Sequence, residues 1–226
     1  GGAVPGVFDN LTVNNSGTLN LQANGGGEDL RLNNSAVLNN LTGGQIRFVG
    51  PDQQINTNST PGTLNNSGGT ISLVGGVNGT INPTTFNLSA GTLDAGTQTM
   101  TLAGNTNYSG SPTLTGAVSM TAGTHSFADS TTIGGAGTLT QAGATVTMGT
   151  VTLNKAYSLA TGNTLNISTG DTVTLNAGLA LSTNSTVAGA GTTSVLSIPS
   201  GQALTFSGGG AVPGVFDNLT VNNSGT

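Results

Sequence analysis

GGAVPGVFDNLTVNNSGT occupies residues 1–18 and returns, letter for letter, at residues 209–226. Eighteen consecutive matches at an offset of 208 residues do not arise by chance. Identity at a fixed period is the mark of a repeat architecture, and it has to be considered before any local pattern. The simplest interpretation is a tandem array, in which residues 1–208 form one unit and residues 209–226 begin the next, identical unit.

The composition is dominated by four small or short polar residue types. Gly (38), Thr (39), Asn (26) and Ser (20) together supply 123 of the 226 residues. Such a bias can mean disorder, but disordered chains of this kind usually carry a high net charge. Here only 5% of the residues are charged and 34% are hydrophobic, arranged in short regular runs. We therefore expect an ordered chain.

Short runs in which apolar residues alternate with Thr, Ser or Asn recur along the whole sequence. This period of two is typical of a strand with one buried face, whereas no window has the apolar spacing of a helix. The predicted strands are 11–13, 18–21, 30–32, 46–49, 70–74, 86–88, 100–102, 118–120, 125–127, 138–140, 145–148, 151–153, 157–159, 164–167, 172–175, 179–181, 195–198 and 204–206.

Gly-rich and Asn-rich segments separate these runs and predict turns, because Gly and Asn tolerate positive φ. Examples are 14–17, 65–69 and 134–137, and the phrase Gly-Thr-Leu at Gly17, Gly62, Gly91 and Gly137 indicates a corner followed by strand entry. The stretch 92–123 looks long, so we expect one bulged coil near Tyr108–Pro112.

Strands of three to five residues are too short for a good sandwich but suit a solenoid, where each strand stacks on its equivalent in the next coil. The sequence thus predicts an all-β fold, a single parallel β-solenoid. With about 20 residues per coil and ~4.8 Å between stacked strands, a unit has roughly ten coils and spans ~50 Å. We expect the inner stack to include Leu11, Val13, Leu73, Leu102, Leu139, Leu153, Leu165 and Leu175.

The segment Thr99–Gly110 and the Gly-Thr-Leu phrases resemble the strand repeats of bacterial autotransporter passengers and filamentous-haemagglutinin-like adhesins. The resemblance is compositional and covers most of the chain. It implies a right-handed parallel β-helix, a bacterial source and a place on the cell surface. Long identical units depart from that pattern and favour a fibre over a single stalk.

Charge and cysteine content argue against several classes of function. Arg31, Arg47 and Lys155 are the only basic residues beside eight acids, which is too few for a nucleic-acid surface. No run of eighteen apolar residues could span a bilayer, and the absence of Cys excludes disulfides and thiolate metal sites. We expect no cofactor.

No constellation of catalytic or metal-binding residues can be assembled from the sequence. His125 is the single histidine, two places before Phe127 on the same strand face, which predicts a structural role. A carbohydrate-cleaving β-helix would need clustered carboxylates, and here they are dispersed. We therefore expect no catalytic site, no metal site and no enzyme, although stacking could still bring distant acids together.

The outward Thr-x-Thr phrases leave a second function open. Threonines at 97, 99 and 101, at 145 and 147, and at 172 and 174 could match a regular lattice, such as ice or a polysaccharide. The plainer interpretation is that Thr is a common outward residue in strands.

The sequence thus predicts a structural repeat of a long extracellular filament, with further copies of the same repeat as its partner. A solenoid end exposes unpaired backbone and core, and here the next repeat would cover it. The alternative is an adhesin stalk that binds glycans or surfaces through Thr/Asn ladders. The predicted repeat-junction residues are Gly1, Val4, Pro5, Phe8, Leu11 and Val13, with their twins Gly209, Val212, Pro213, Phe216, Leu219 and Val221.

Overall fold

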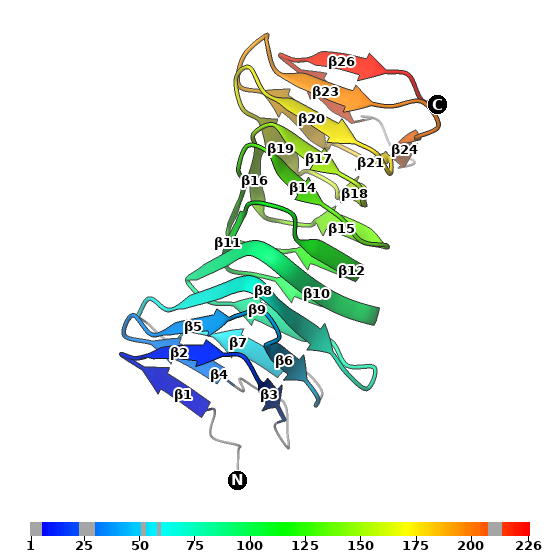
Figure 1. The fold of residues 1–226 in the computed structure, drawn as a ribbon. Helices are drawn as coiled ribbons and strands as arrows, with labels where there is room; N and C mark the ends of the chain where they lie inside the picture. Colours follow the sequence, from blue (N-terminus) through cyan, green and yellow to red (C-terminus); the bar gives the residue numbers. More distant parts are fainter. Residues whose placement is uncertain (1–5, 23–29, 51–52, 58–59, 208–213) are drawn as a thin grey trace.

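The computed structural model describes residues 6–22, 30–50, 53–57, 60–207 and 214–226. Its strands stack in one column, from the N-terminal end at the bottom to the C-terminal end at the top (Figure 1). Alternation of apolar and polar residues decides which side of each strand is buried. Leu30 and Leu32 point inward and are buried, while Arg31 and Asn33 between and beside them are only partly covered.

The column has three faces, and each coil contributes one strand segment to every face. The first face contains β1 (Gly6–Asp9), β4 (Leu30–Asn33), β7 (Gln53–Asn56), β9 (Gly79–Asn82), the ends of β10 (Thr85–Leu102) and β12 (Thr113–Met120), β15 (Thr138–Gln141), β18 (Ala156–Leu159), β21 (Leu179–Ser182) and β24 (Leu204–Ser207). The second face contains β2 (Thr12–Asn15), β5 (Val37–Asn40), the starts of β8 (Thr63–Leu73) and β10, β11 (Asn105–Tyr108), β13 (Thr124–Phe127), β16 (Thr145–Met148), β19 (Thr164–Ile167), β22 (Thr186–Gly189) and β25 (Val215–Asp217). The third face contains β3 (Thr18–Leu21), β6 (Gln45–Phe48), the end of β8, the middle of β10, the start of β12, β14 (Thr131–Ile133), β17 (Val151–Leu153), β20 (Thr172–Leu175), β23 (Val195–Ile198) and β26 (Thr220–Asn223).

Each strand pairs in parallel with its equivalents in the coils above and below. The described residues contain no helix. Strands β8, β10 and β12 continue round a corner without a break, so one long strand there serves two or three faces. The prediction of an all-β parallel solenoid is confirmed, with about nine turns.

The core is a set of inward apolar stacks that run up the column. Five of the predicted inner residues are fully buried, namely Leu102, Leu139, Leu153, Leu165 and Leu175. Leu73 and Val13 are partly buried and pack against this core. Leu11 lies in the corner between β1 and β2, where the equivalent residue of the next coil, Ala36, is fully buried. Leu11 itself remains 42% exposed, because no described coil lies below it.

Coil length varies, and the predicted bulge near Tyr108–Pro112 is wrong. In-register partners are 18 residues apart at Met100 and Val118, but 29 apart at Thr186 and Val215. Tyr108 lies regularly in β11 and is buried, and the register irregularities fall instead within β10, between Leu88 and Thr92 and between Asp94 and Thr99.

The Asn-rich segment 65–69, predicted as a turn, lies inside the continuous strand β8. Asn is a poor strand former when its amide has no partner. Here Asn65 donates from Nδ2 to Oδ1 of Asn39 at 2.7 Å. A partner one coil away therefore overrides the local preference.

Candidate functional site

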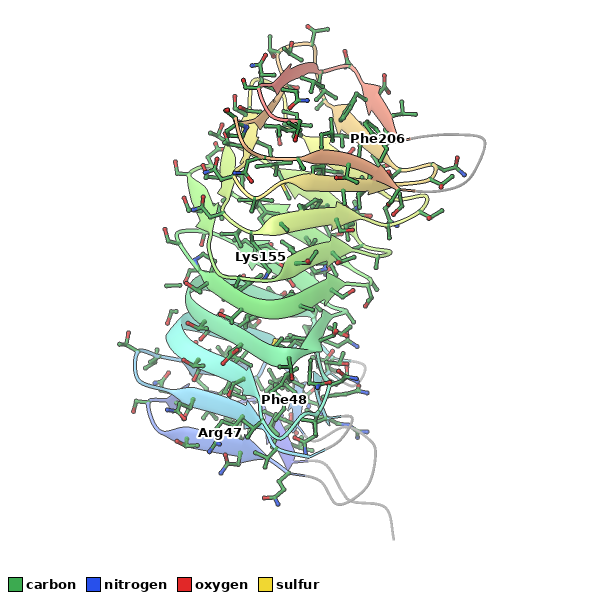
Figure 2. All side chains as sticks on the ribbon, turned by 90° about the vertical axis from the view of Figure 1, so that its right-hand side faces the viewer. Arg47, Phe48, Lys155 and Phe206 are labelled. Atoms are coloured by element: carbon green, nitrogen blue, oxygen red, sulfur yellow. The ribbon has the colours of Figure 1, made fainter. Side chains whose placement is uncertain are left out.

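Four of the five large hydrophobic side chains that are exposed in the described residues lie at the two ends of the column. Val7 in β1 and Leu11 are 46% and 42% exposed at the N-terminal end. Phe206 in β24 and Val215 in β25 are 50% and 42% exposed at the C-terminal end, where Figure 2 shows Phe206 near the top of the stack. An open solenoid end also presents unpaired strand backbone, so both ends are surfaces suited to further stacking.

Six of the twelve predicted junction residues belong to the described residues, and they lie at the two ends of the column. Gly1, Val4, Pro5, Gly209, Val212 and Pro213 lie outside the described residues. At the N-terminal end Phe8 and Val13 are partly buried against the core. Their twins Phe216 and Val221, together with Leu219, are partly buried against the core at the other end.

Leu11 and Leu219 are the same position of the repeated sequence in two settings. Leu11 lies at the open end and is 42% exposed, whereas Leu219 packs against the core because a coil lies beneath it. The junction thus covers apolar surface that an end leaves open.

The described parts of the two copies share two local conformations. Asn10 and Asn218 both have the left-handed backbone, with φ of 49° and 52°. Asn15 Oδ1 accepts from the backbone N–H of Gly17 at 3.3 Å, and Asn223 Oδ1 accepts from Gly225 N–H at 3.0 Å. The short sequence therefore determines its own corner geometry.

The second copy nevertheless continues the stack on different faces from the first. β1 pairs with β4 on the first face, but its twin β25 pairs with β22 on the second. β2 pairs with β5 on the second face, but its twin β26 pairs with β23 on the third. The repeated sequence has moved forward by one face.

Regular backbone hydrogen bonds hold this last coil on the coil below. Val215 N–H donates to Ser185 O at 2.8 Å, and Thr220 N–H donates to Ser194 O at 2.9 Å. Leu204 N–H in β24 donates to Thr226 O at 2.7 Å, so the chain is already returning to the first face. The junction has the same ladder bonding as the interior of the column.

The second face carries an outward asparagine ladder over five successive coils. Each amide donates to Oδ1 of the residue one coil below, with separations of 2.7 to 2.8 Å. The members are Asn14, Asn39, Asn65, Asn87 and Asn107.

A threonine opens most strands of this face, at positions 12, 63, 85, 124, 145, 164 and 186. The Thr-x-Thr phrases do not share one face, since Thr101, Thr147 and Thr174 lie on the first, second and third.

A second, inner ladder runs beside the first at the end of the same strands. Asn15 Nδ2 donates to Asn40 Oδ1, and Asn40 Nδ2 donates to Asn66 Oδ1, both at 2.9 Å. Asn40 and Asn66 are fully buried. The ladder ends at Asn66, whose Nδ2 has no partner, because Leu88 occupies the next position of the stack.

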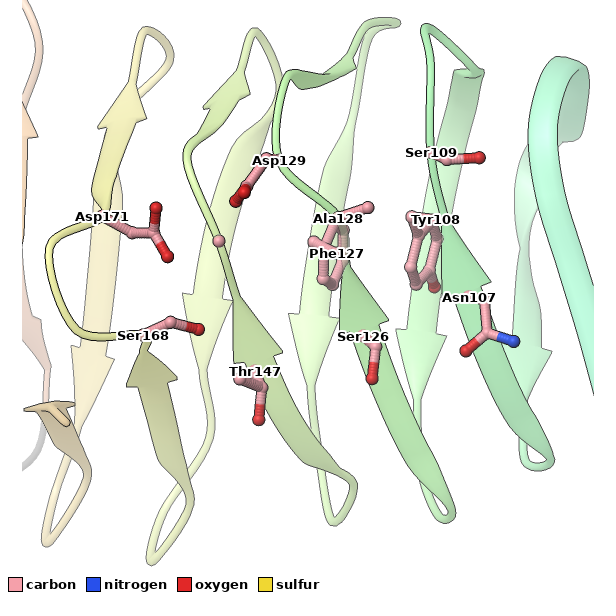
Figure 3. A pocket seen from close by; sticks show the side chains of 11 residues that line it. Asn107, Tyr108, Ser109, Ser126, Phe127, Ala128, Asp129, Thr147, Ser168 and Asp171 are labelled. Carbon is pink, nitrogen blue, oxygen red and sulfur yellow. The ribbon is translucent and has the colours of Figure 1, made fainter.

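A shallow depression of about 520 Å³ lies where β11, β13 and β16 end (Figure 3). Its two carboxylates, Asp129 and Asp171, belong to different coils and both bond to Thr150 between them. Thr150 N–H donates to Asp129 Oδ1 at 3.0 Å, and Thr150 Oγ1 donates to Asp171 Oδ1 at 2.7 Å. These contacts tie three coils together. No cluster of three metal-ligating side chains occurs in the described residues.

His125 is buried in β13 and contacts Tyr108, one of the two aromatic residues that line this depression. The rings of Tyr108 and Phe127 are parallel, with centroids 4.0 Å apart. His125 Nε2 lies 3.0 Å from Ala122 O, which can only accept, so Nε2 carries the proton and Nδ1 accepts from the Tyr108 hydroxyl at 3.3 Å. Burial lowers the pKa of His125 to about 4, partly offset by the bond to Ala122, and burial raises the pKa of Tyr108. His125 is therefore neutral at pH 7, and both of its ring nitrogens have hydrogen-bond partners within the column.

Lys155 was not predicted to have a role, yet it is buried at mid-height of the column (Figure 2). Its Nζ donates to Leu114 O at 2.8 Å, Gly116 O at 2.7 Å and Ala136 O. Three N–H groups thus meet three carbonyls from the two coils below. Burial lowers the pKa of Lys155 to about 8, so the ammonium form still prevails at neutral pH.

Comparison with protein-family models, curated proteins and solved structures finds no match for this chain. No helix in the described ranges is long and apolar enough to cross a membrane.

Proposed function

We propose that this chain is a structural repeat of a long extracellular filament, in which identical units stack head to tail as one continuous β-solenoid. The observation that best supports a continuous filament is the position of residues 214–226. They have the sequence of residues 6–18, and they lie on the last coil in parallel register instead of starting a separate domain.

The chemistry of the column suits a passive, durable element. The ladder bonds satisfy polar side chains within the stack, and the four small residue types allow coils to approach closely. Arg31, Arg47 and Lys155 leave few sites for a protease that cleaves after basic residues, and one of these, Lys155, is buried. This composition suits exposure outside a cell, and the resemblance to autotransporter passengers and filamentous-haemagglutinin-like adhesins supports placement on a bacterial surface.

Electron microscopy of chains with one, two and three 208-residue units tests the proposal. The described strands of one unit form nine coils and one further strand, which at ~4.8 Å per coil is ~45 Å of length. We expect unbranched rods that lengthen by ~45 Å with each unit. Separate beads joined by linkers, or closed particles of constant length, would overturn the filament.

A second candidate function has one specific observation in its favour. The outward Asn ladder and the strand-opening threonines give the second face a regular polar lattice. Such a face could bind a polysaccharide, as an adhesin stalk would. Thr145→Lys on the second face and Thr174→Lys on the third, compared in sedimentation with insoluble cellulose, decide between the two. Loss of binding only with Thr145→Lys favours the adhesin, and no binding by the unsubstituted chain favours the filament.

A further inference from the structure

The relation between the two copies of the repeated sequence fixes how successive units would be arranged. Val7 in β1 lies on the first face opposite Arg31, while its twin Val215 lies on the second face opposite Thr186. Asn14 lies on the second face below Asn39, while its twin Asn222 lies on the third face above Ser197. Both strands of the copy are displaced in the same sense.

Thr18 and its twin Thr226 complete the pattern. Thr18 opens β3 on the third face, paired with Gln45. Thr226 accepts from Leu204 N–H at 2.7 Å and donates to Gln202 O at 2.9 Å, which places it on the first face beside β24. All three faces are thus exchanged in order: first to second, second to third and third to first.

We propose that consecutive units are related by a screw of one third of a turn, with each new unit starting one face further round the column. This rests on the proposed filament. From β1 to β25 the described strands advance by twenty-eight face positions, which is nine coils and one further strand. Because twenty-eight is not a multiple of three, the same sequence returns to the same face only after three units, or ~134 Å at ~4.8 Å per coil.

The surface that receives the next unit fits this arrangement. The bond from Leu204 N–H to Thr226 O sets the register, which would place the twins of Leu19 and Leu21 over Leu204 and Phe206. Leu204 is only partly buried here and Phe206 is 50% exposed. Both point toward the column interior, since they lie above the buried Leu179 and Leu181. The residues that cover this surface are therefore those of the next identical unit in the same chain. The strand equivalent to β3 lies on the third face in the first unit and on the first face in the next.

The screw has a consequence for what the filament displays. The outward Asn ladder covers five coils of one face within a unit. In the next unit the same ladder lies on the adjacent face, so three units present it in all three directions. A filament of this kind has no single functional side, and any lattice-binding face would be distributed evenly round the axis.

Engineered disulfides test the screw within the 226-residue chain, which contains no Cys. Ser197 and Asn222 are in-register neighbours on the third face, so their Cα atoms lie within disulfide range. If successive units were related by translation alone, Asn222 would lie on the second face, as its twin Asn14 does. It would then lie above Ala188 of β22. We compare Ser197→Cys/Asn222→Cys with Ala188→Cys/Asn222→Cys under mild oxidation, and follow bridge formation by mass spectrometry.

The expected result is at least tenfold faster bridging of the Ser197→Cys/Asn222→Cys variant, with both reduced variants retaining the far-ultraviolet spectrum of the unsubstituted chain. Preferential bridging to position 188, or equal rates, would overturn the screw. The filament itself is judged separately by microscopy of the multi-unit chains. Rods whose helical reconstruction shows translation without rotation would support the filament and contradict the screw. Fast bridging between positions 197 and 222 without rods would support the screw and contradict the filament.

Discussion

Gly225 lies directly against the backbone of Gln202, and a Cβ at this position would overlap the carbonyl oxygen of Gln202. Its twin Gly17, at the open end, has nothing within 4 Å of the corresponding Cβ position. The same glycine of the repeat is therefore required where a coil lies beneath it and dispensable where none does.

Gly225→Ala should loosen the last coil, because the obstacle is main chain and cannot move aside like a flexible side chain. Overpacking of this kind costs about 1–3 kcal/mol. Hydrogen–deuterium exchange should show residues 220–226 exchanging roughly 5- to 100-fold faster. Gly17→Ala is the matched control, with unchanged exchange throughout. Equal effects from the two substitutions would show that the glycine serves the local turn and not the junction.

Lys155→Met should destabilise the middle of the column. The substitution leaves the carbonyls of Leu114, Gly116 and Ala136 without the ammonium that bonds them. Buried acceptors that lose a charged donor cost several kcal/mol, and we expect a loss of about 2–4 kcal/mol in urea unfolding.

Arg47→Met removes one positive charge from an outward position on β6 and is the control for net charge. Its expected effect is below about 1 kcal/mol. If both variants lost the same stability, the three bonds of Lys155 would not be the cause.

Local pattern was sufficient to predict the strands that alternate regularly, such as 145–148 and 172–175. It failed for Asn-rich strands such as β5 and the start of β8, because their stabilising ladder partner lies 25 or 26 residues away. Lys155 was missed for the same reason, since its acceptors are 19 to 41 residues distant. The exposure of Leu11 could not be predicted, because local pattern indicates which side chains point inward but not which coil lies at an end of the stack.

The face occupied by each copy of the repeat could not be predicted at all. Coil length ranges from 18 to 29 residues, so a count of residues does not give the number of strands between two positions. Local sequence determines the corner at Asn10 and Asn218 equally well on either face. Only the complete set of pairings reveals the displacement by one face.

Asn40→Leu should destabilise the lower coils, because it removes the donor to Asn66 Oδ1 and to Thr70 O and leaves Asn15 Nδ2 with fewer partners. The expected loss is about 1–3 kcal/mol, measured by chemical unfolding. Asn39→Leu, which interrupts the outward ladder where water can replace the bonds, should cost less than about 1 kcal/mol.

The double variant Asn40→Leu/Asn66→Leu should lose less than the sum of its two single variants. Asn66 Nδ2 is already without a partner, and Leu88 continues the same stack above it. Replacing both members of a buried pair by apolar side chains removes the orphaned groups that each single change creates. Strict additivity in the double-mutant cycle would contradict the ladder as the source of stability.

Acid should weaken the fold through His125. Burial holds the pKa of His125 at about 4 in the folded chain, against 6.5 for an ordinary histidine. Between these two pH values the unfolded chain takes up a proton that the folded chain does not. Stability is therefore intact above about pH 6.5 and falls as the pH drops toward 4, by up to roughly 3 kcal/mol, with no further loss from this group below that.

Urea unfolding of the unsubstituted chain and of His125→Gln at a series of pH values between 4 and 7 measures this contribution. All other titratable groups are the same in both chains, so the difference between the two profiles isolates the imidazole. We expect a steeper decline below pH 6.5 for the unsubstituted chain, because His125→Gln has no group at this position to charge. Parallel profiles would mean that the imidazole is solvated when protonated, and that the stack of Tyr108 and Phe127 opens without cost to admit it.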